Sequence, residues 1–461
     1  MPKKDKAADL VERIRKYSVA DEVEVIVYTT RNALTRFANN VIHQNLAEEN
    51  VAVSVRTVFA GRTARATTNK IDDEGLKRVV EASENLAKVQ HFDPDLLPMA
   101  DAREGSSTAQ RIPNRHFERT AAVTPEERAE IVRAIVAVAE KHWLTAAGIV
   151  STSETFEGVF NGRGLSTWHT QTAAEISITM LGKDSSGWQK ANSPNVDNLD
   201  AATFAESAAR KAVEAAKPRE IPPGKYTVIL EPAAVLDLVG FMFYDFGGLA
   251  VLDQRSFLND RVGTQLFGQN INIWDDVAHP LQSGAPFDGE GIGRQKVQLV
   301  ENGVVRRLVY ARGTAARMHR SESKDKVGPI EPTGHGFPLP NEIGEAPMNI
   351  VFGTTDSPKT VDEMVASTEQ GILVTRLWYI REVDPYEKIV TGMTRDGTFY
   401  VENGRIGYGV RNFRFNESLI HMLSNVEAMG TPVRASGEES FDMVVPAMQV
   451  RQFNFTEVTK F

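Results

Sequence analysis

The chain contains 461 residues, of which 41% are hydrophobic and 25% are charged, and its formal net charge is -9 at pH 7. This balance is that of a soluble globular protein, and the length predicts two or three domains. The acidic charge argues against nucleic acid as a partner, because binding a phosphate backbone requires clustered Lys and Arg. Five arginines between residues 306 and 320 are diluted by apolar residues, which favours a solvated or interface face.

The sequence also lacks features that particular chemistries and locations require. It contains no cysteine, which excludes disulfides, a thiol nucleophile and any cysteine-ligated metal. No apolar run reaches the roughly 18 to 20 residues that a membrane helix needs. The first residues carry no apolar signal-peptide core. We therefore expect a cytoplasmic protein that has no membrane partner.

Helix and strand patterns alternate along the first third of the chain. Residues 7–17 place apolar side chains at helical spacing, and residues 72–88 do the same. Residues 22–30 and 51–59 alternate valines with polar or smaller neighbours, which predicts two strands.

A second set of similar patterns follows. Thr124, Pro125 and Glu127 form a helix start that predicts a helix to about Trp143. A turn at 160–164, a strand at 175–181 and an Ala-rich helix at 200–216 come next. The shared order suggests a duplicated αβ unit. Chance similarity between two common αβ patterns is the alternative.

Proline-rich breaks and Asn-Gly turns divide the chain. Residues 217–224 hold three prolines, which oppose both helix and sheet. Beyond them, Asn302-Gly303 and Asn403-Gly404 each lie between apolar-rich strands and predict hairpins. We therefore predict an α+β protein with an N-terminal antiparallel sheet and helices, possibly a duplicated αβ unit, followed by a β-rich C-terminal domain. The expected domains are residues 1–115, 116–222 and 223–461.

The C-terminal half carries an ordered series of short segments that together resemble one family. Each segment alone is common turn or strand chemistry, but their order between residues 249 and 428 is specific. They resemble the TldD/PmbA family, whose members are also labelled modulators of DNA gyrase. The segments are 249–258, 286–291, 299–304, 371–379, 384–385, 391–399 and 423–428. The N-terminal part matches this family less sharply.

The resemblance implies a metal site that this sequence cannot build. In the catalytic TldD branch it implies a His-Glu-x-x-x-His helix and a further ligand, commonly Cys, that together hold a peptidase zinc. None of the nine histidines here is followed by Glu. The segment that corresponds to that helix, 233–246, has no histidine, and the Cys position falls near Ser436-Gly437.

The resemblance therefore points to the TldE/PmbA-type subunit of a peptidase assembly. It implies no catalytic residue and no cofactor in this chain, with zinc in a TldD-like homologue. The expected partners are that homologue in a heterodimer, or a second copy in a homodimer, together with a peptide substrate. Two alternatives stay open: an independent metal-dependent peptidase with an atypical site, and a homodimeric peptide-binding protein.

A few residues are candidates for contact with substrate or partner. Arg376, Arg395 and Asp396 could bind a peptide terminus through paired hydrogen bonds, although an internal ion pair between strands explains them equally well. Tyr379 and His335 complete this candidate set.

Two further groups of residues could carry chemistry. Asp288 and Glu290 could form an acid/base pair, but a tight turn whose carboxylates bind backbone amides is the stronger interpretation. His319, Glu322 and His335 are the only candidate metal cluster. Hydrogen bonding or partner contact explains this second group better, because metal sites need convergent ligands with supporting partners.

Overall fold

The computed structural model describes residues 4–106 and 110–459. The N-terminal half contains one order of elements twice, a helix, three antiparallel strands and a second helix. The first set is α1 (Lys4–Tyr17), β1 (Glu22–Ala38), β2 (Val41–Phe59), β3 (Arg62–Thr68) and α2 (Asp73–Val89). The second set is α5 (Pro125–Lys141), β4 (Thr145–Asn161), β5 (Ser166–Leu181), β6 (Ser186–Ser193) and α6 (Ala201–Glu214).

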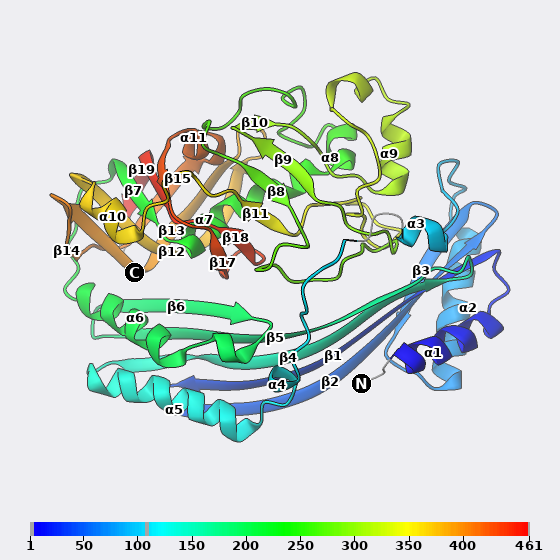
Figure 1. Cartoon of the computed structure of the whole chain (residues 1–461), viewed down its shortest axis with the longest axis horizontal. Helices are drawn as coiled ribbons and strands as arrows, with labels where there is room; N and C mark the ends of the chain where they lie inside the picture. Colours follow the sequence, from blue (N-terminus) through cyan, green and yellow to red (C-terminus); the bar gives the residue numbers. More distant parts are fainter. Residues whose placement is uncertain (1–3, 107–109, 460–461) are drawn as a thin grey trace.

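All six strands join in one sheet with the order β3-β2-β1-β4-β5-β6. The two sets meet at its centre, where β1 pairs antiparallel with β4. The four helices cover one face, and the C-terminal domain lies over the other (Figure 1). Segments 1–115 and 116–222 thus contribute to one sheet, and the boundary proposed between them stays a prediction.

Local signals explain the helices of this half. Thr124 and Glu127 form the expected capping box of α5, and the Asp72 side chain caps α2 by accepting from the Gly75 amide. Each pair of helices buries its own core against the sheet, with Val25 and Val27 under α1 and α2, and Ile176 and Ile178 under α5 and α6.

The strands are longer than the sequence predicts. The expected strands 22–30 and 51–59 lie inside β1 and β2, which have 17 and 19 residues. At about 3.3 Å per residue such strands extend about 55 to 63 Å. The added stretches carry no alternation of apolar residues because they have little core to cover, and residues 41–50 are all exposed.

The C-terminal half is β-rich, as expected, and is built from two sheets. One has the order β12-β7-β19-β15-β13-β14, and an extra β12–β13 pairing gives it a barrel-like closure. The other has the order β10-β9-β8-β11-β18-β17. The strands are β7 (Gly224–Leu230), β8 (Ile273–Asp275), β9 (Val297–Glu301), β10 (Val304–Val305), β11 (Ile350–Phe352), β12 (Gln370–Asp384), β13 (Ile389–Glu402), β14 (Arg405–Gly409), β15 (Phe413–Ser418), β16 (Val426–Met429), β17 (Val433–Ala435), β18 (Met443–Val445) and β19 (Met448–Val458).

Both predicted Asn-Gly hairpins are confirmed. Asn302 and Gly303 join β9 to β10, and Asn403 and Gly404 join β13 to β14, all four with positive φ. Two-residue hairpin turns require this left-handed backbone conformation, which Asn and Gly adopt more readily than other residues.

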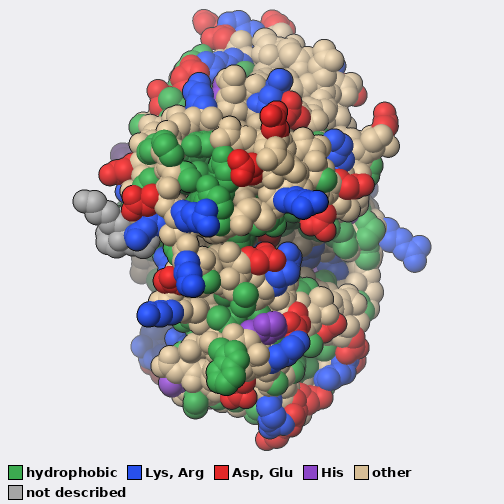
Figure 2. Space-filling view, turned by 90° about the vertical axis from the view of Figure 1, so that its left-hand side faces the viewer, with side chains coloured by type: hydrophobic (Ala, Val, Ile, Leu, Met, Phe, Trp, Pro, Cys, Tyr) green, Lys and Arg blue, Asp and Glu red, His purple; other side chains and the backbone are tan. Residues whose placement is uncertain are grey.

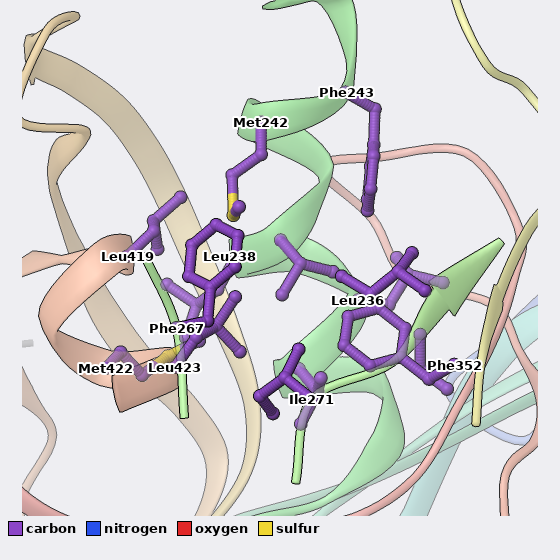
Figure 3. Packing of buried hydrophobic residues seen from close by; sticks show 14 of the residues in the cluster. Leu236, Leu238, Met242, Phe243, Phe267, Ile271, Phe352, Leu419, Met422 and Leu423 are labelled. Carbon is purple, nitrogen blue, oxygen red and sulfur yellow. The ribbon is translucent and has the colours of Figure 1, made fainter. Parts of the chain in front are cut away.

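An apolar helical segment fills the space between the two C-terminal sheets. It consists of α7 (Pro232–Val239) and the 3-10 helix η2 (Gly240–Phe246). Figure 3 shows its side chains, among them Leu238 and Met242, packing against Phe267 and Leu423. The remaining helices are α3 (Ala102–Ser106), α4 (Glu118–Ala121), η1 (Val196–Asn198), α8 (Gly248–Leu252), α9 (Arg312–Met318), η3 (Lys324–Lys326), α10 (Val361–Ala366) and α11 (Leu419–Ser424).

Candidate functional site at the domain boundary

Asp237 is the one acidic residue in α7, and it is fully buried. Its Oδ1 accepts hydrogen bonds from the amides of Glu438 and Glu439, at 3.2 and 3.0 Å. A Cβ atom placed on Gly437 would lie 2.1 Å from the same oxygen. The structure therefore brings together segments 233–246 and 436–437, the two for which the family resemblance implied metal ligands.

The environment of Asp237 favours its protonated form. Burial raises the pKa of this carboxyl to about 7, although the two amides oppose that shift. Its second oxygen, Oδ2, is buried and has no hydrogen-bond partner among the described residues. Near neutral pH the side chain therefore exchanges a proton inside the core.

The loop 436–442, between β17 and β18, is also held from outside α7. Lys190 on β6 donates to the Gly437 carbonyl at 3.0 Å, and its Nζ lies 3.7 Å from a Glu438 carboxylate oxygen. Asn192, also on β6, donates to Asp442 at 2.7 Å. The N-terminal sheet thus fixes the loop that faces α7.

Glu439 in the same loop supports a strained residue on β12. Tyr379 has φ +56, in the left-handed region, and lies at a register shift between β12 and β13. Its amide donates to Glu439 Oε1 at 2.6 Å. A bulky residue in this conformation costs free energy and persists only where its surroundings hold it. The Tyr379 side chain is 52% exposed, so this bulge presents an aromatic ring at the surface.

Arg376 and Asp396 form an ion pair at the boundary between the domains. Arg376 Nε donates to Asp396 Oδ2 at 2.8 Å, and both side chains are buried. The other carboxylate oxygen accepts from the Ser186 hydroxyl at 2.6 Å. The guanidinium also lies 4.8 Å from the ring centre of Trp188 on β6. The two side chains thus bind each other and the N-terminal sheet, and Asp396 also lies 3.5 Å from Arg395 Nε.

The other two expected contact residues, Arg395 and His335, differ in how exposed they are. Arg395 is half-exposed and stacks on Trp378 at 4.8 Å. His335 is buried, with Nδ1 3.0 Å from Thr333 Oγ1 and Nε2 3.0 Å from Asp275 Oδ1. Of the five residues, only Tyr379 and Arg395 present their side chains at the surface of this chain. Figure 2 views the end of the molecule where the two layers meet, and charged side chains of both signs follow that boundary.

The structure does not bring the candidate metal cluster His319, Glu322 and His335 together. His319 and Glu322 are exposed, whereas His335 is buried. Across residues 4–106 and 110–459, no three His, Cys, Asp or Glu side chains are grouped so that they could hold a metal ion.

Asp288 and Glu290 have the contacts of a tight turn. Asp288 accepts from the amides of Glu290, Ile292 and Gly336, at 2.8 to 3.0 Å. Glu290 accepts from the Arg312 amide at 3.3 Å and pairs with its guanidinium at 3.5 Å. Burial raises the pKa of both carboxyls.

An acidic groove of about 700 Å³ adjoins η2 and the 436–442 loop. Lys388 lies in it, almost fully buried, 2.5 Å from Asp245 and 2.7 Å from Glu382. Lys388, Asp237 and Lys190 were not among the residues predicted from sequence. Two aspartates in the otherwise apolar stretch 233–246 could have indicated this region, because a buried carboxyl needs a hydrogen-bond or charge partner.

Two parts of the chain match models of one protein family. Residues 223–457 match the PmbA/TldA metallopeptidase C-terminal domain, and residues 23–87 match PmbA/TldA metallopeptidase domain 1. The chain belongs to the PmbA/TldD metallopeptidase family. The family resemblance expected from sequence is therefore confirmed.

Individual relatives agree with this assignment. The chain is 22% identical to Metalloprotease PmbA of Escherichia coli O157:H7, over 87% of this chain and 85% of that protein. It is 23% identical to a Metalloprotease PmbA homolog of Haemophilus influenzae, over 87% of both. The fold is similar to that of TldE from Thermococcus kodakarensis, with a TM-score of 0.84, 19% identity, and coverage of 98% of this chain and 100% of that one. None of the helices in the described part of the chain is long and apolar enough to cross a membrane.

The family name implies a metal, and the residues at α7 can be tested for one. A catalytic zinc needs three protein ligands, usually including imidazoles. Here α7 offers one carboxyl whose Oδ1 is occupied by two amides, and Gly437 leaves no room for a side chain. The residues present do not fit a zinc ion at this position.

Proposed function

We propose that this chain is the non-catalytic subunit of a TldD/TldE-type assembly in which a zinc-bearing homologue degrades or processes peptides. Membership of a metallopeptidase family and the structural likeness to a TldE support this proposal. The main observation in its favour is that Asp237 binds backbone amides. At the position where the catalytic branch would hold its motif, this carboxyl binds the backbone amides of Glu438 and Glu439.

The contribution of this chain is a contact surface for the partner or its peptide. Tyr379, whose amide binds the groove residue Glu439, presents an aromatic ring, and Arg395 presents a cation on the neighbouring strand β13. Arg376 and Asp396 lie behind them and hold β12 and β13 against β6. His335 lies in the core and supports the fold around Asp275.

Mixing experiments test the proposal. The purified chain, a zinc-bearing homologue and the mixture are each assayed for peptide cleavage, with metal analysis of this chain. We expect cleavage that requires the homologue, increases when this chain is added and stops with a chelator. Chelator-sensitive cleavage by this chain alone, with about one tightly held zinc per chain, would favour the independent peptidase and contradict the proposal.

Variants locate the contact surface. Tyr379→Ala combined with Arg395→Ala is expected to reduce the stimulation of the homologue by at least about tenfold, because aromatic and Arg side chains dominate interfaces. The matched control is Tyr386→Ala, which removes another half-exposed tyrosine in the β12–β13 turn. If both variants lost the same amount of stimulation, the surface of Tyr379 and Arg395 would have no specific role in contact with the homologue.

A further inference from the structure

The acidic groove beside η2 has three walls. The helix η2 supplies Phe241 and Tyr244, and the loop between β17 and β18 supplies Phe441. The β12–β13 hairpin supplies Glu382 and Lys388. The volume of the groove is about 700 Å³, which is within the range of sites that bind small organic groups. The groove therefore has room for a ligand.

Carboxylates outnumber cations in this groove. Lys388 is the one cation among its described lining residues, whereas four carboxylates line it, those of Asp245, Glu382, Glu438 and Glu439. Lys388 is 3% exposed, and its Nζ lies 2.5 Å from Asp245 and 2.7 Å from Glu382. This lysine is bound inside the wall, so a ligand that enters the groove meets negative charge.

Two cations outside the groove do not neutralise this charge. Lys190 Nζ lies 3.7 Å from Glu438, and Arg381 Nη1 lies 3.6 Å from Glu439. Both distances exceed the roughly 2.7 to 2.9 Å of a hydrogen-bonded ion pair. Together with the buried lysine, these residues give three cations for four carboxylates. Glu438 is 31% exposed, and Glu382, on another wall, is 33% exposed. Both carboxylates are therefore accessible to a cation from outside.

Aromatic rings line the same groove. Phe241 and Phe441 are partly buried, and Tyr244 is 48% exposed. An aromatic face attracts a cation, and Lys and Arg side chains also bring an apolar stem that packs on such rings. Within the described parts of the chain, no three His, Cys, Asp or Glu side chains are grouped so that they could hold a metal ion. The groove therefore suits a basic organic group better than a metal ion.

Asp237 gives independent evidence for a hydrogen-bond donor at this place. It precedes Gly240 by three residues and Phe241 by four, so the three share the helix face that borders the groove. Its Oδ1 binds the amides of the groove residues Glu438 and Glu439. Its Oδ2 is buried and has no hydrogen-bond partner among the described residues. A buried acceptor without a partner costs free energy, and a donor that enters the groove would remove that cost.

We propose that the groove binds a Lys or Arg side chain of the peptide that the assembly handles, with the cation between Glu382 and Glu438. The peptide in this statement rests on the proposed function. The selection of a positive charge rests on the groove residues alone. The inference specifies a substrate class, namely peptides with a basic residue, and it predicts that an acidic residue at the same position is repelled.

Binding to this chain alone tests the selection. Three fluorescently labelled peptides differ only in one central residue, which is Arg, Gln or Glu, and fluorescence anisotropy measures the dissociation constant of each. We expect the Arg peptide to bind at least about tenfold more tightly than the Gln peptide, and the Glu peptide to bind most weakly. The advantage of Arg should shrink as salt is added, because salt screens exposed charges. No binding of the Arg peptide, or equal affinity for the Arg and Gln peptides, overturns the proposal.

Charge-removing variants locate the cation. Glu382→Gln combined with Glu438→Gln is expected to bind the Arg peptide no more tightly than the parent binds the Gln peptide. Because Glu382 also holds Lys388, far-ultraviolet circular dichroism checks that the variant folds. Glu438→Gln alone leaves that pair intact and should lose part of the preference. The matched control is Glu387→Gln, on a glutamate that pairs with Arg261 outside the groove. A preference for Arg that survives in the double variant contradicts the proposal.

Tyr244 tests the contribution of the rings. Tyr244→Ala is expected to weaken binding of the Arg peptide about threefold, whereas Tyr244→Phe keeps the aromatic face and should bind as the parent does. Equal weakening of the Arg and Gln peptides by Tyr244→Ala counts against a contact with the cation. These results are distinguishable from failure of the proposed function. If the homologue is stimulated equally with Arg and Gln peptides, and neither binds this chain preferentially, the selection fails and the subunit role stands.

Discussion

Asp237 is a carboxyl that binds two backbone amides inside the core. Burial raises its pKa to about 7. Such a group affects stability in a defined direction. The folded state keeps the proton up to about pH 7, whereas the unfolded chain loses it near pH 4, at about 3.9. Its contribution to stability is therefore complete below pH 4 and is lost as the pH rises toward 7.

Asp237→Asn is expected to flatten the pH dependence of unfolding between pH 5 and 7. Each pH unit in this window changes the free energy of unfolding by up to about 1.4 kcal/mol per such group. Burial also raises the pKa of Glu345 to about 7, so the variant should lose part of the slope and not all of it. Urea unfolding at several pH values measures the slope. Identical slopes in the variant and the parent would contradict this account.

At the scale of elements, the loop 436–442 packs closely against α7. A Cβ on Gly437 would meet Asp237 Oδ1 at 2.1 Å and Leu236 Cδ2 at 2.7 Å. Both atoms are buried in the core, so the loop must move to admit a methyl group. Movement would break the two amide contacts to Asp237 and loosen Glu439 from Tyr379.

Gly437→Ala is therefore expected to lower the free energy of unfolding by about 1 to 3 kcal/mol, as overpacking usually does. Gly313→Ala is the matched control. That glycine lies in α9, and nothing lies within 4 Å of its added Cβ, so the change should be neutral or slightly stabilising. Denaturant unfolding of both variants measures the difference. A Gly437→Ala protein as stable as the parent would mean that the loop has an alternative position.

Elements were predictable from sequence where their cause is local. The capping box at Thr124 and the Asn302-Gly303 hairpin depend on a few adjacent residues, and both were found. The second half of β1 and the first half of β2 were missed. Residues 41–50 are all exposed, so no buried face imposes alternation there, and only Thr35 and Phe37 are buried in residues 31–38. The contact of Asp237 with Glu438 joins positions far apart in the chain, so nothing near Asp237 indicates it.

At the scale of the whole molecule, the Arg376–Asp396 pair joins the two halves. It connects β12 and β13 to Ser186 and Trp188 on β6. Both residues were predicted from sequence, with an ion pair as one explanation. The contacts with Trp188 and Ser186 could not be predicted, because they depend on how the two halves pack.

Arg376→Met is expected to cost about 3 kcal/mol, because it leaves a buried carboxylate without its main partner. Arg376→Met with Asp396→Asn should recover part of that loss, since no unpaired charge remains. Arg395→Met, on the half-exposed neighbour, should change stability by about 1 kcal/mol or less. Thermal unfolding of the three proteins measures the order. A double variant less stable than Arg376→Met would contradict the explanation.

The central pairing of β1 with β4 has a consequence for synthesis of the chain. β1 forms its hairpin with β2 from neighbouring residues, but its other side pairs with β4, from Glu24 opposite Asn161 to Phe37 opposite Gly148. One side of β1 therefore stays without its strand partner until the ribosome has released β4, about 120 residues later in the chain. Pairing between distant segments is slow and leaves strands open to aggregation. We therefore expect the chain to need a chaperone most while its first half has been synthesised and β4 has not.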